Sequence, residues 1–199
     1  MVDLGGVFYI NLDHRTDRRA EIEKELTDMD LKFERFPAIR TQYGIVGCGL
    51  SHLAVLKEAK ARGYPNVLIF EDDFQFLVTK EQFHASLQKA LTKEYDVIML
   101  GYNTDETPEV VDGRMRLTNV QSASGYIVHS RMYDTLIAVQ EEAVKRLAET
   151  GMHWLYSNDQ SWKVLQPTTL WYALQPRTGK QRPSISDTDY APRFAEYNC

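Results

Sequence analysis

The sequence predicts an α/β domain with a mostly parallel central sheet flanked by helices. Three short apolar runs, rich in β-branched or aromatic residues, predict buried strands over 7–10, 67–70 and 97–100. Their hydrophobicity is continuous rather than alternating, which suits strands that are covered on both faces. Segments with helical periodicity separate these strands, and the alternation of strand and helix is typical of parallel sheets.

The first half of the chain supplies the elements between these strands. A helix is expected over 16–29, charged on one side, with Thr16 as the residue that caps its start. A short strand follows over 33–36. A second helix is expected over 50–62, because its apolar residues gather near one face and Gly63 stops it.

The second half of the chain reads differently. Asp112-Gly113, within 109–120, is a hairpin signal. From about Arg177 the chain loses periodicity, so we expect an irregular C-terminal tail that folds over the sheet. The remaining expected elements are helices over 81–91 and 131–149 and strands over 126–128 and 170–173.

Composition restricts the class of protein. The 199 residues suggest a single domain over 1–199, long enough to bury a sizeable core. The two cysteines exclude a disulfide scaffold, and the net charge of −5 argues against a nucleic-acid partner. No run has the length of a transmembrane helix and the N-terminus lacks a signal-peptide pattern, so the expected location is cytoplasmic. The sequence leaves the oligomeric state undetermined.

The sharpest local feature is the acidic triplet Glu71-Asp72-Asp73, directly after the strand at 67–70. In open α/β sheets, ligands bind outside the carboxyl ends of the strands. Three adjacent carboxylates repel one another unless a cation is present, and oxygen ligands suit Mg²⁺ or Mn²⁺. The alternative is a solvated acidic loop that caps the next helix.

Six blocks of sequence resemble glycosyltransferase family 25, which includes lipopolysaccharide-synthesis enzymes and collagen galactosyltransferases. The first three are the more specific in combination, and the last three are weaker. The blocks lie at 9–19, 47–53, 67–74, 124–128, 158–162 and 181–187.

The resemblance implies a nucleotide-binding domain of the GT-A type. It implies an inverting hexosyltransferase that depends on Mn²⁺ or Mg²⁺ and uses a UDP-sugar donor, most often UDP-galactose, with glucose as the alternative. The acceptor would be a hydroxyl group of a glycan or of a hydroxylysine-containing protein.

The resemblance also assigns roles to residues. Asp73, Asp187 and Glu71 are the candidate metal ligands, and Asp159 is the candidate base, with a helix N-cap as the alternative for Asp159. The candidate UDP-sugar contacts are Ile10, Asn11, Leu12, Arg15, Arg18, Ser51, His52, Glu71, Asp72, Gln181 and Ser184.

Several of these assignments have plain alternatives. Arg15 and Arg18 are either phosphate ligands or part of an exposed helix face. Ser51 and His52 follow a Gly-x-Gly at the predicted start of a helix, where phosphate is favoured, but His52 is nearly as typical of a hydrogen-bonded core residue. Cys48 is interpreted as structural.

Other functions compete with the transferase. One is a catalytically inactive UDP-sugar-binding module of the same fold, and another is a metal-dependent phosphohydrolase or nucleotidyltransferase. Trp162, Trp154 and Tyr126 are either a platform for a sugar or core residues.

Overall fold

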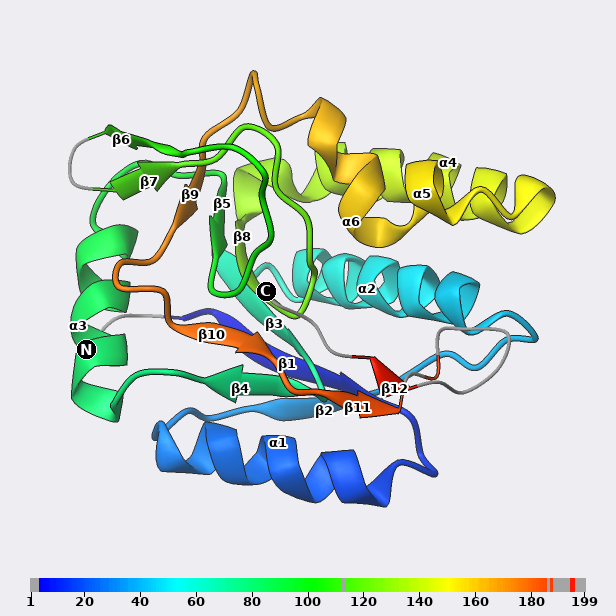
Figure 1. The fold of residues 1–199 in the computed structure, drawn as a ribbon, viewed down its shortest axis with the longest axis horizontal. Helices are drawn as coiled ribbons and strands as arrows, with labels where there is room; N and C mark the ends of the chain where they lie inside the picture. Colours follow the sequence, from blue (N-terminus) through cyan, green and yellow to red (C-terminus); the bar gives the residue numbers. More distant parts are fainter. Residues whose placement is uncertain (1–3, 112–113, 186, 188–193, 196–199) are drawn as a thin grey trace.

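A mixed sheet of eight strands forms the centre of the computed structural model, which describes residues 4–111, 114–185, 187 and 194–195 (Figure 1). Asp112-Gly113, the predicted hairpin turn, and Cys199 lie outside the described residues. From one edge to the other the strands are β2 (Glu34–Pro37), β1 (Gly6–Asn11), β3 (Asn66–Glu71), β8 (Gly125–His129), β5 (Val97–Met99), β9 (Trp171–Ala173), β7 (Arg114–Arg116) and β6 (Glu109–Val111).

Most strands of this sheet point the same way, as expected. β1 is parallel to both β2 and β3, and β5 is parallel to β9. β8 runs antiparallel between β3 and β5, and so preserves the common direction of the strands on either side of it. The register pairs Ile10 with Glu71 and Asn11 with Pro37, so the carboxyl ends of β1, β2 and β3 lie level at one edge of the sheet.

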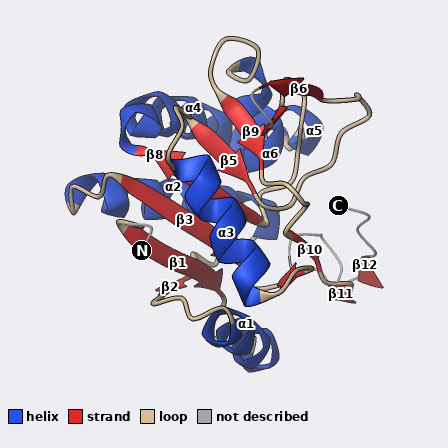
Figure 2. Ribbon diagram, turned by 90° about the vertical axis from the view of Figure 1, so that its left-hand side faces the viewer, coloured by secondary structure: helices blue, strands red, loops and turns tan. Residues whose placement is uncertain are grey.

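Helices cover both faces of the sheet (Figure 2). On one face the core includes Leu56 of α2 (Gly44–Ala61) and Leu136 of α4 (Tyr133–Thr150). On the other face it includes Leu26 of α1 (Thr16–Asp28) and Phe83 of α3 (Lys80–Leu91). The 3₁₀ turn Ser130–Met132 precedes α4, and the short helices α5 (His153–Tyr156) and α6 (Asn158–Ser161) and the 3₁₀ turn Trp162–Val164 follow it.

The predicted cap of α1 and the predicted start of α2 are wrong. α1 begins at Thr16 itself, and Arg15 occupies the N-cap position with no side-chain cap hydrogen bond. α2 begins at Gly44 rather than at Leu50, so Gly47-Cys48-Gly49 lies within the helix. The physical reason is packing, because a Cβ at Gly47 would lie 2.4 Å from the carbonyl oxygen of Ile39.

The C-terminal tail is more regular than expected. Its segment β10 (Gly179–Gln181) pairs antiparallel with β4 (Phe74–Phe76), which directly follows the acidic triplet. A second short pair joins β11 (Ser184–Ile185) to β12 (Phe194–Ala195). A Cβ at Gly179 would lie 1.9 Å from Cζ of Phe74, so the close approach of these two strands depends on glycine.

The helices in the described part of the chain are all too short or too polar to cross a membrane.

Candidate functional site

A cavity of about 410 Å³ lies at the edge of the sheet where β1 and β3 end. The predicted site residues that line it are Ile10, Asn11, Leu12, Arg18, Ser51, His52, Glu71, Asp72, Asp73, Asp159, Gln181 and Asp187. Arg15 is not among the lining residues, but it forms an ion pair with Asp187, which is. Ser184 lies in β11, and its side chain is outside the described part of the structure. Residues from both ends of the chain therefore meet at one cavity.

One guanidinium group serves two carboxylates of the acidic triplet. Nη1 of Arg18 lies 2.9 Å from Oδ1 of Asp72 and 3.3 Å from Oδ2 of Asp73. Nδ2 of Asn11 also donates to Asp72, over 2.7 Å. Arg18 is 9% exposed, so the alternative of an exposed helix face is wrong for this residue.

The two aspartates of the triplet are buried, and this changes their titration. Burial raises the pKa of Asp72 above its ordinary value, although Arg18 and Asn11 oppose the change. Burial and the negative charge of Glu71 raise the pKa of Asp73 to about 7, against the attraction of Arg18. The positive charge of Arg18 therefore does not offset the cost of burying the carboxylates of Asp72 and Asp73.

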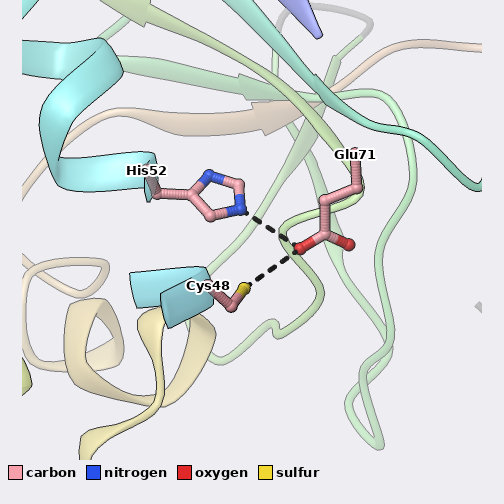
Figure 3. Close-up of side chains that lie close together, drawn as sticks. All are labelled: Cys48, His52 and Glu71. Atoms are coloured by element: carbon pink, nitrogen blue, oxygen red, sulfur yellow. Dashed lines mark hydrogen bonds and ion pairs between the residues drawn. The ribbon is translucent and has the colours of Figure 1, made fainter. Parts of the chain in front are cut away.

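Glu71 is held by a separate set of partners (Figure 3). Its Oε1 lies 3.1 Å from Nε2 of His52 and 3.7 Å from Sγ of Cys48, while its Oε2 accepts from Nε2 of Gln181 over 3.0 Å. Burial alone would raise the pKa of Glu71, but the interactions with His52, Arg18 and Cys48 together lower it. His52 is wholly buried, and its Nδ1 is joined to Oη of Tyr126 over 2.9 Å.

A divalent cation fits Asp73 best among the predicted metal ligands. Oδ1 of Asp73 is buried without a hydrogen-bond partner, whereas both oxygens of Glu71 have partners. Asp187 pairs with Arg15, and Nε2 of His14 lies 3.6 Å from its Oδ1. In the described residues the group of three close donors that could hold a metal is Cys48, His52 and Glu71, not the predicted trio.

Asp159 lines the cavity from the first turn of α6. Its Oδ2 accepts from the backbone N–H of Ser122 over 3.0 Å, and its Oδ1 accepts from Oγ of Ser157 over 2.9 Å. Ser157 occupies the N-cap position, so the N-cap interpretation of Asp159 is wrong. The carboxylate instead fixes α6 against the loop that precedes β8.

Some expected roles do not fit the structure. Ser51 lies inside α2, where its Oγ accepts from the backbone N–H of Ile39 and donates to the carbonyl of Gly47, so it is not at a phosphate-binding helix start. Tyr126 and Trp162 are wholly buried and pack edge to face, so they are core residues rather than a sugar platform. Trp154 on α5 is 59% exposed.

The sequence interpretation missed three features of the cavity wall. Cys48 was expected to be structural, but it lines the cavity beside Glu71. Asn158 also lines it, although only its neighbour Asp159 was singled out. The loop at 38–42 also lines it, and its place directly after the strand predicted over 33–36 is the signal that could have identified it.

Comparison with known proteins gives a family match and distant relatives. The family described as "Glycosyltransferase family 25 (LPS biosynthesis protein)" matches residues 43–121. "Inactive glycosyltransferase 25 family member 3" of Mus musculus is 26% identical over 195 residues, which covers 80% of this chain and 31% of the relative. "Procollagen galactosyltransferase 1-A" of Xenopus laevis is 28% identical over 141 residues, which covers 54% of this chain and 23% of the relative. The chain thus spans about a third or less of the length of these relatives.

Two solved structures share the fold. The crystal structure of A197 from STIV superposes with a TM-score of 0.51 at 12% identity and covers 97% of this chain and 95% of that chain. A glycosyltransferase involved in the glycosylation of the major capsid of PBCV-1 superposes with a TM-score of 0.51 at 7% identity and covers 86% and 81%. At such identities the likeness concerns the fold alone.

Proposed function

Because the chain resembles glycosyltransferase family 25, as its family match and its curated relatives show, we propose that it is the donor-binding and catalytic domain of a glycosyltransferase. The reaction is the inverting, metal-dependent transfer of a hexose from a UDP-sugar, galactose first and glucose as the alternative. The acceptor is a hydroxyl group of a glycan or of a hydroxylysine-containing protein. The observation that carries the proposal is the single cavity in which the acidic triplet, Arg18, Asp159 and the tail residues meet.

The donor would bind along the carboxyl ends of β1 and β3. Ile10, Asn11 and Leu12 line this part of the cavity and would face the uracil ring, while Asp72, fixed by Asn11 and Arg18, would accept hydrogen bonds from the ribose hydroxyls. Asp73 would hold Mn²⁺ or Mg²⁺ through its unpartnered oxygen. When bound, the ion supplies positive charge that stabilises the leaving diphosphate.

Asp159 is proposed to take the proton of the acceptor hydroxyl. Hydrogen bonds from Ser122 and Ser157 fix the carboxylate in place, so its position does not depend on the ligand. We expect Asp159→Asn to lower transfer by at least about 100-fold, the contribution typical of a general base. Because the amide keeps the size and acceptor oxygen of the carboxylate, UDP-sugar affinity measured by calorimetry should stay within about threefold. Loss of donor binding together with transfer would contradict the assignment.

The activity itself is tested with a panel of UDP-sugars and Mn²⁺, read as released UDP. The expected result is metal-dependent release with one preferred hexose, lost in Asp73→Asn. Asp105→Asn serves as the control, because Asp105 is an exposed residue that does not line the cavity. No release with any donor and acceptor tested, or release that is insensitive to Asp73→Asn, would overturn the proposal.

A second candidate is a UDP-sugar-binding module without transferase activity. One observation favours it: the cations facing the acidic groups are already engaged, Arg18 with Asp72 and Asp73, and Arg15 with Asp187. Two curated relatives are also named as inactive members of the family. UDP binding in calorimetry, with no UDP release from any donor, would support this candidate over the enzyme.

A further inference from the structure

We infer that Cys48, His52 and Glu71 form a binding site for a thiophilic divalent ion such as Zn²⁺, separate from the oxygen-only site proposed at Asp73. Cys48 and His52 are one turn apart on α2, so their side chains lie on the same face of the helix. Glu71 is the last residue of β3, and its carboxylate points at both side chains (Figure 3).

The spacing of the donor atoms is close to that of a zinc site. Nε2 of His52 lies 3.1 Å and Sγ of Cys48 lies 3.7 Å from Oε1 of Glu71, and all three donor atoms lie within 4.8 Å of one another. Tetrahedral zinc, with bonds of about 2.0–2.3 Å, holds its ligand atoms about 3.3–3.7 Å apart. The largest separation therefore needs to shorten by no more than about 1.5 Å to hold the ion.

The ligands also have outer partners, which is typical of metal sites. His52 is bonded through Nδ1 to Oη of Tyr126, and Gln181 holds Oε2 of Glu71, so both ligands are oriented before an ion arrives. With the ion on Nε2, the imidazole proton resides on Nδ1 and is donated to Oη of Tyr126.

The proton balance is simple. Burial and the charge of Glu71 raise the pKa of the Cys48 thiol well above its ordinary value, so the metal-free protein carries a thiol. Binding replaces that proton with the ion, and one proton is released per ion bound.

The donor set selects the type of ion. Thiolate and imidazole ligands suit Zn²⁺, Co²⁺ and Cd²⁺, whereas Mg²⁺ and Mn²⁺ prefer oxygen ligands only. All three residues line the cavity, which gives the ion a path of entry. Three protein ligands would leave a fourth position for water or for an anionic group of a substrate.

The test is a titration of the 199-residue chain with Co²⁺, followed by absorption spectroscopy. We expect a thiolate-to-cobalt charge-transfer band that corresponds to one thiolate-bound ion per chain, and displacement of the band by Zn²⁺. Cys48→Ser should abolish the band, whereas Cys199→Ser, the matched change at the second cysteine of the sequence, should retain it. Tyr126→Phe should weaken Zn²⁺ binding by about 10- to 100-fold, the effect typical of removing an outer partner.

Two outcomes would overturn the inference: no thiolate band in the unaltered chain, or a band that persists in Cys48→Ser. Serine is nearly isosteric with cysteine, and a circular dichroism spectrum identical to that of the unaltered chain excludes misfolding as the cause of a lost band. None of these measurements uses a sugar nucleotide. A failure therefore leaves the proposed transferase function standing, and a failure of the transferase assay leaves the metal site standing.

Discussion

Asp73 should make the metal-free protein less stable at neutral pH than its Asn variant. The carboxyl group is 6% exposed, and burial together with the charge of Glu71 raises its pKa to about 7 from an ordinary 3.8. A raised pKa of an acid means that the folded state holds its proton more tightly than the unfolded state. Stability from this group is therefore complete below about pH 4 and is lost as the pH rises to about 7.

The magnitude follows from the two pKa values. A pKa of about 7 against 3.8 corresponds to about 4 kcal/mol of lost stability above pH 7. Asp73→Asn removes the charge and keeps an oxygen that accepts from Arg18. We therefore expect the variant to be more stable than the unaltered chain by about 4 kcal/mol at pH 8, which is a rise in Tm of about 8–16 °C, and by almost nothing at pH 4.

The assay is urea and thermal unfolding of both proteins between pH 4 and pH 8 in the presence of EDTA. Asp105→Asn, the exposed control, should change stability by no more than about 0.5 kcal/mol at any of these pH values. A gain for Asp73→Asn that is the same at pH 4 and pH 8, or no gain at pH 8, would refute the reasoning. Added Mn²⁺ should stabilise the unaltered chain at pH 8 and leave Asp73→Asn almost unchanged.

Three further changes test electrostatics at the site and packing elsewhere in the fold. Arg18→Met leaves two buried carboxylates without their shared cation and should lower the free energy of unfolding in urea by about 3–5 kcal/mol at pH 8, with a smaller loss at pH 4. An equal loss at both pH values would argue against an electrostatic cause. Gly179→Ala places a Cβ 1.9 Å from Cζ of Phe74 and should cost about 1–3 kcal/mol; full stability in thermal unfolding would show that β10 does not pack on β4 as described. Asp96→Ala removes the acceptor of two hydrogen bonds, from the backbone N–H of Leu170 and from Nε of Arg131, and should lower the free energy of unfolding in urea by about 2–3 kcal/mol. The control Asp134→Ala removes an exposed carboxylate and should lower it by less than about 1 kcal/mol.

The elements of the fold were accessible from the sequence because their signals are local. Continuous apolar runs mark β1, β3 and β5, and each appears in the structure at the expected place. The direction of β8 was not accessible, because an apolar strand has the same pattern in either direction and only its partners fix it. The start of α2 was missed because its glycines, which were expected to precede the helix, lie inside it and serve close packing against Ile39 and Val144.

The site was accessible in part. The acidic triplet after a buried strand was visible as a cluster of like charges in the sequence, and the structure places it at the cavity. Its partners were not visible, because Gln181 reaches Glu71 only after β10 pairs with β4. Cys48 was interpreted as structural because nothing in the sequence near it indicates the carboxylate that faces it.

By itself the sequence determined the α/β class and an acidic motif at a strand end, because hydrophobic periodicity and runs of like charge are properties of neighbouring residues. Only the tertiary structure decided what each of those charges does. It gave Asp72 and Asp73 one shared guanidinium, left one oxygen of Asp73 without a partner, and turned Glu71 toward Cys48 and His52. The physical reason is that the free energy of a charge depends on its burial and on its partners, and both arise from segments that are distant in the chain.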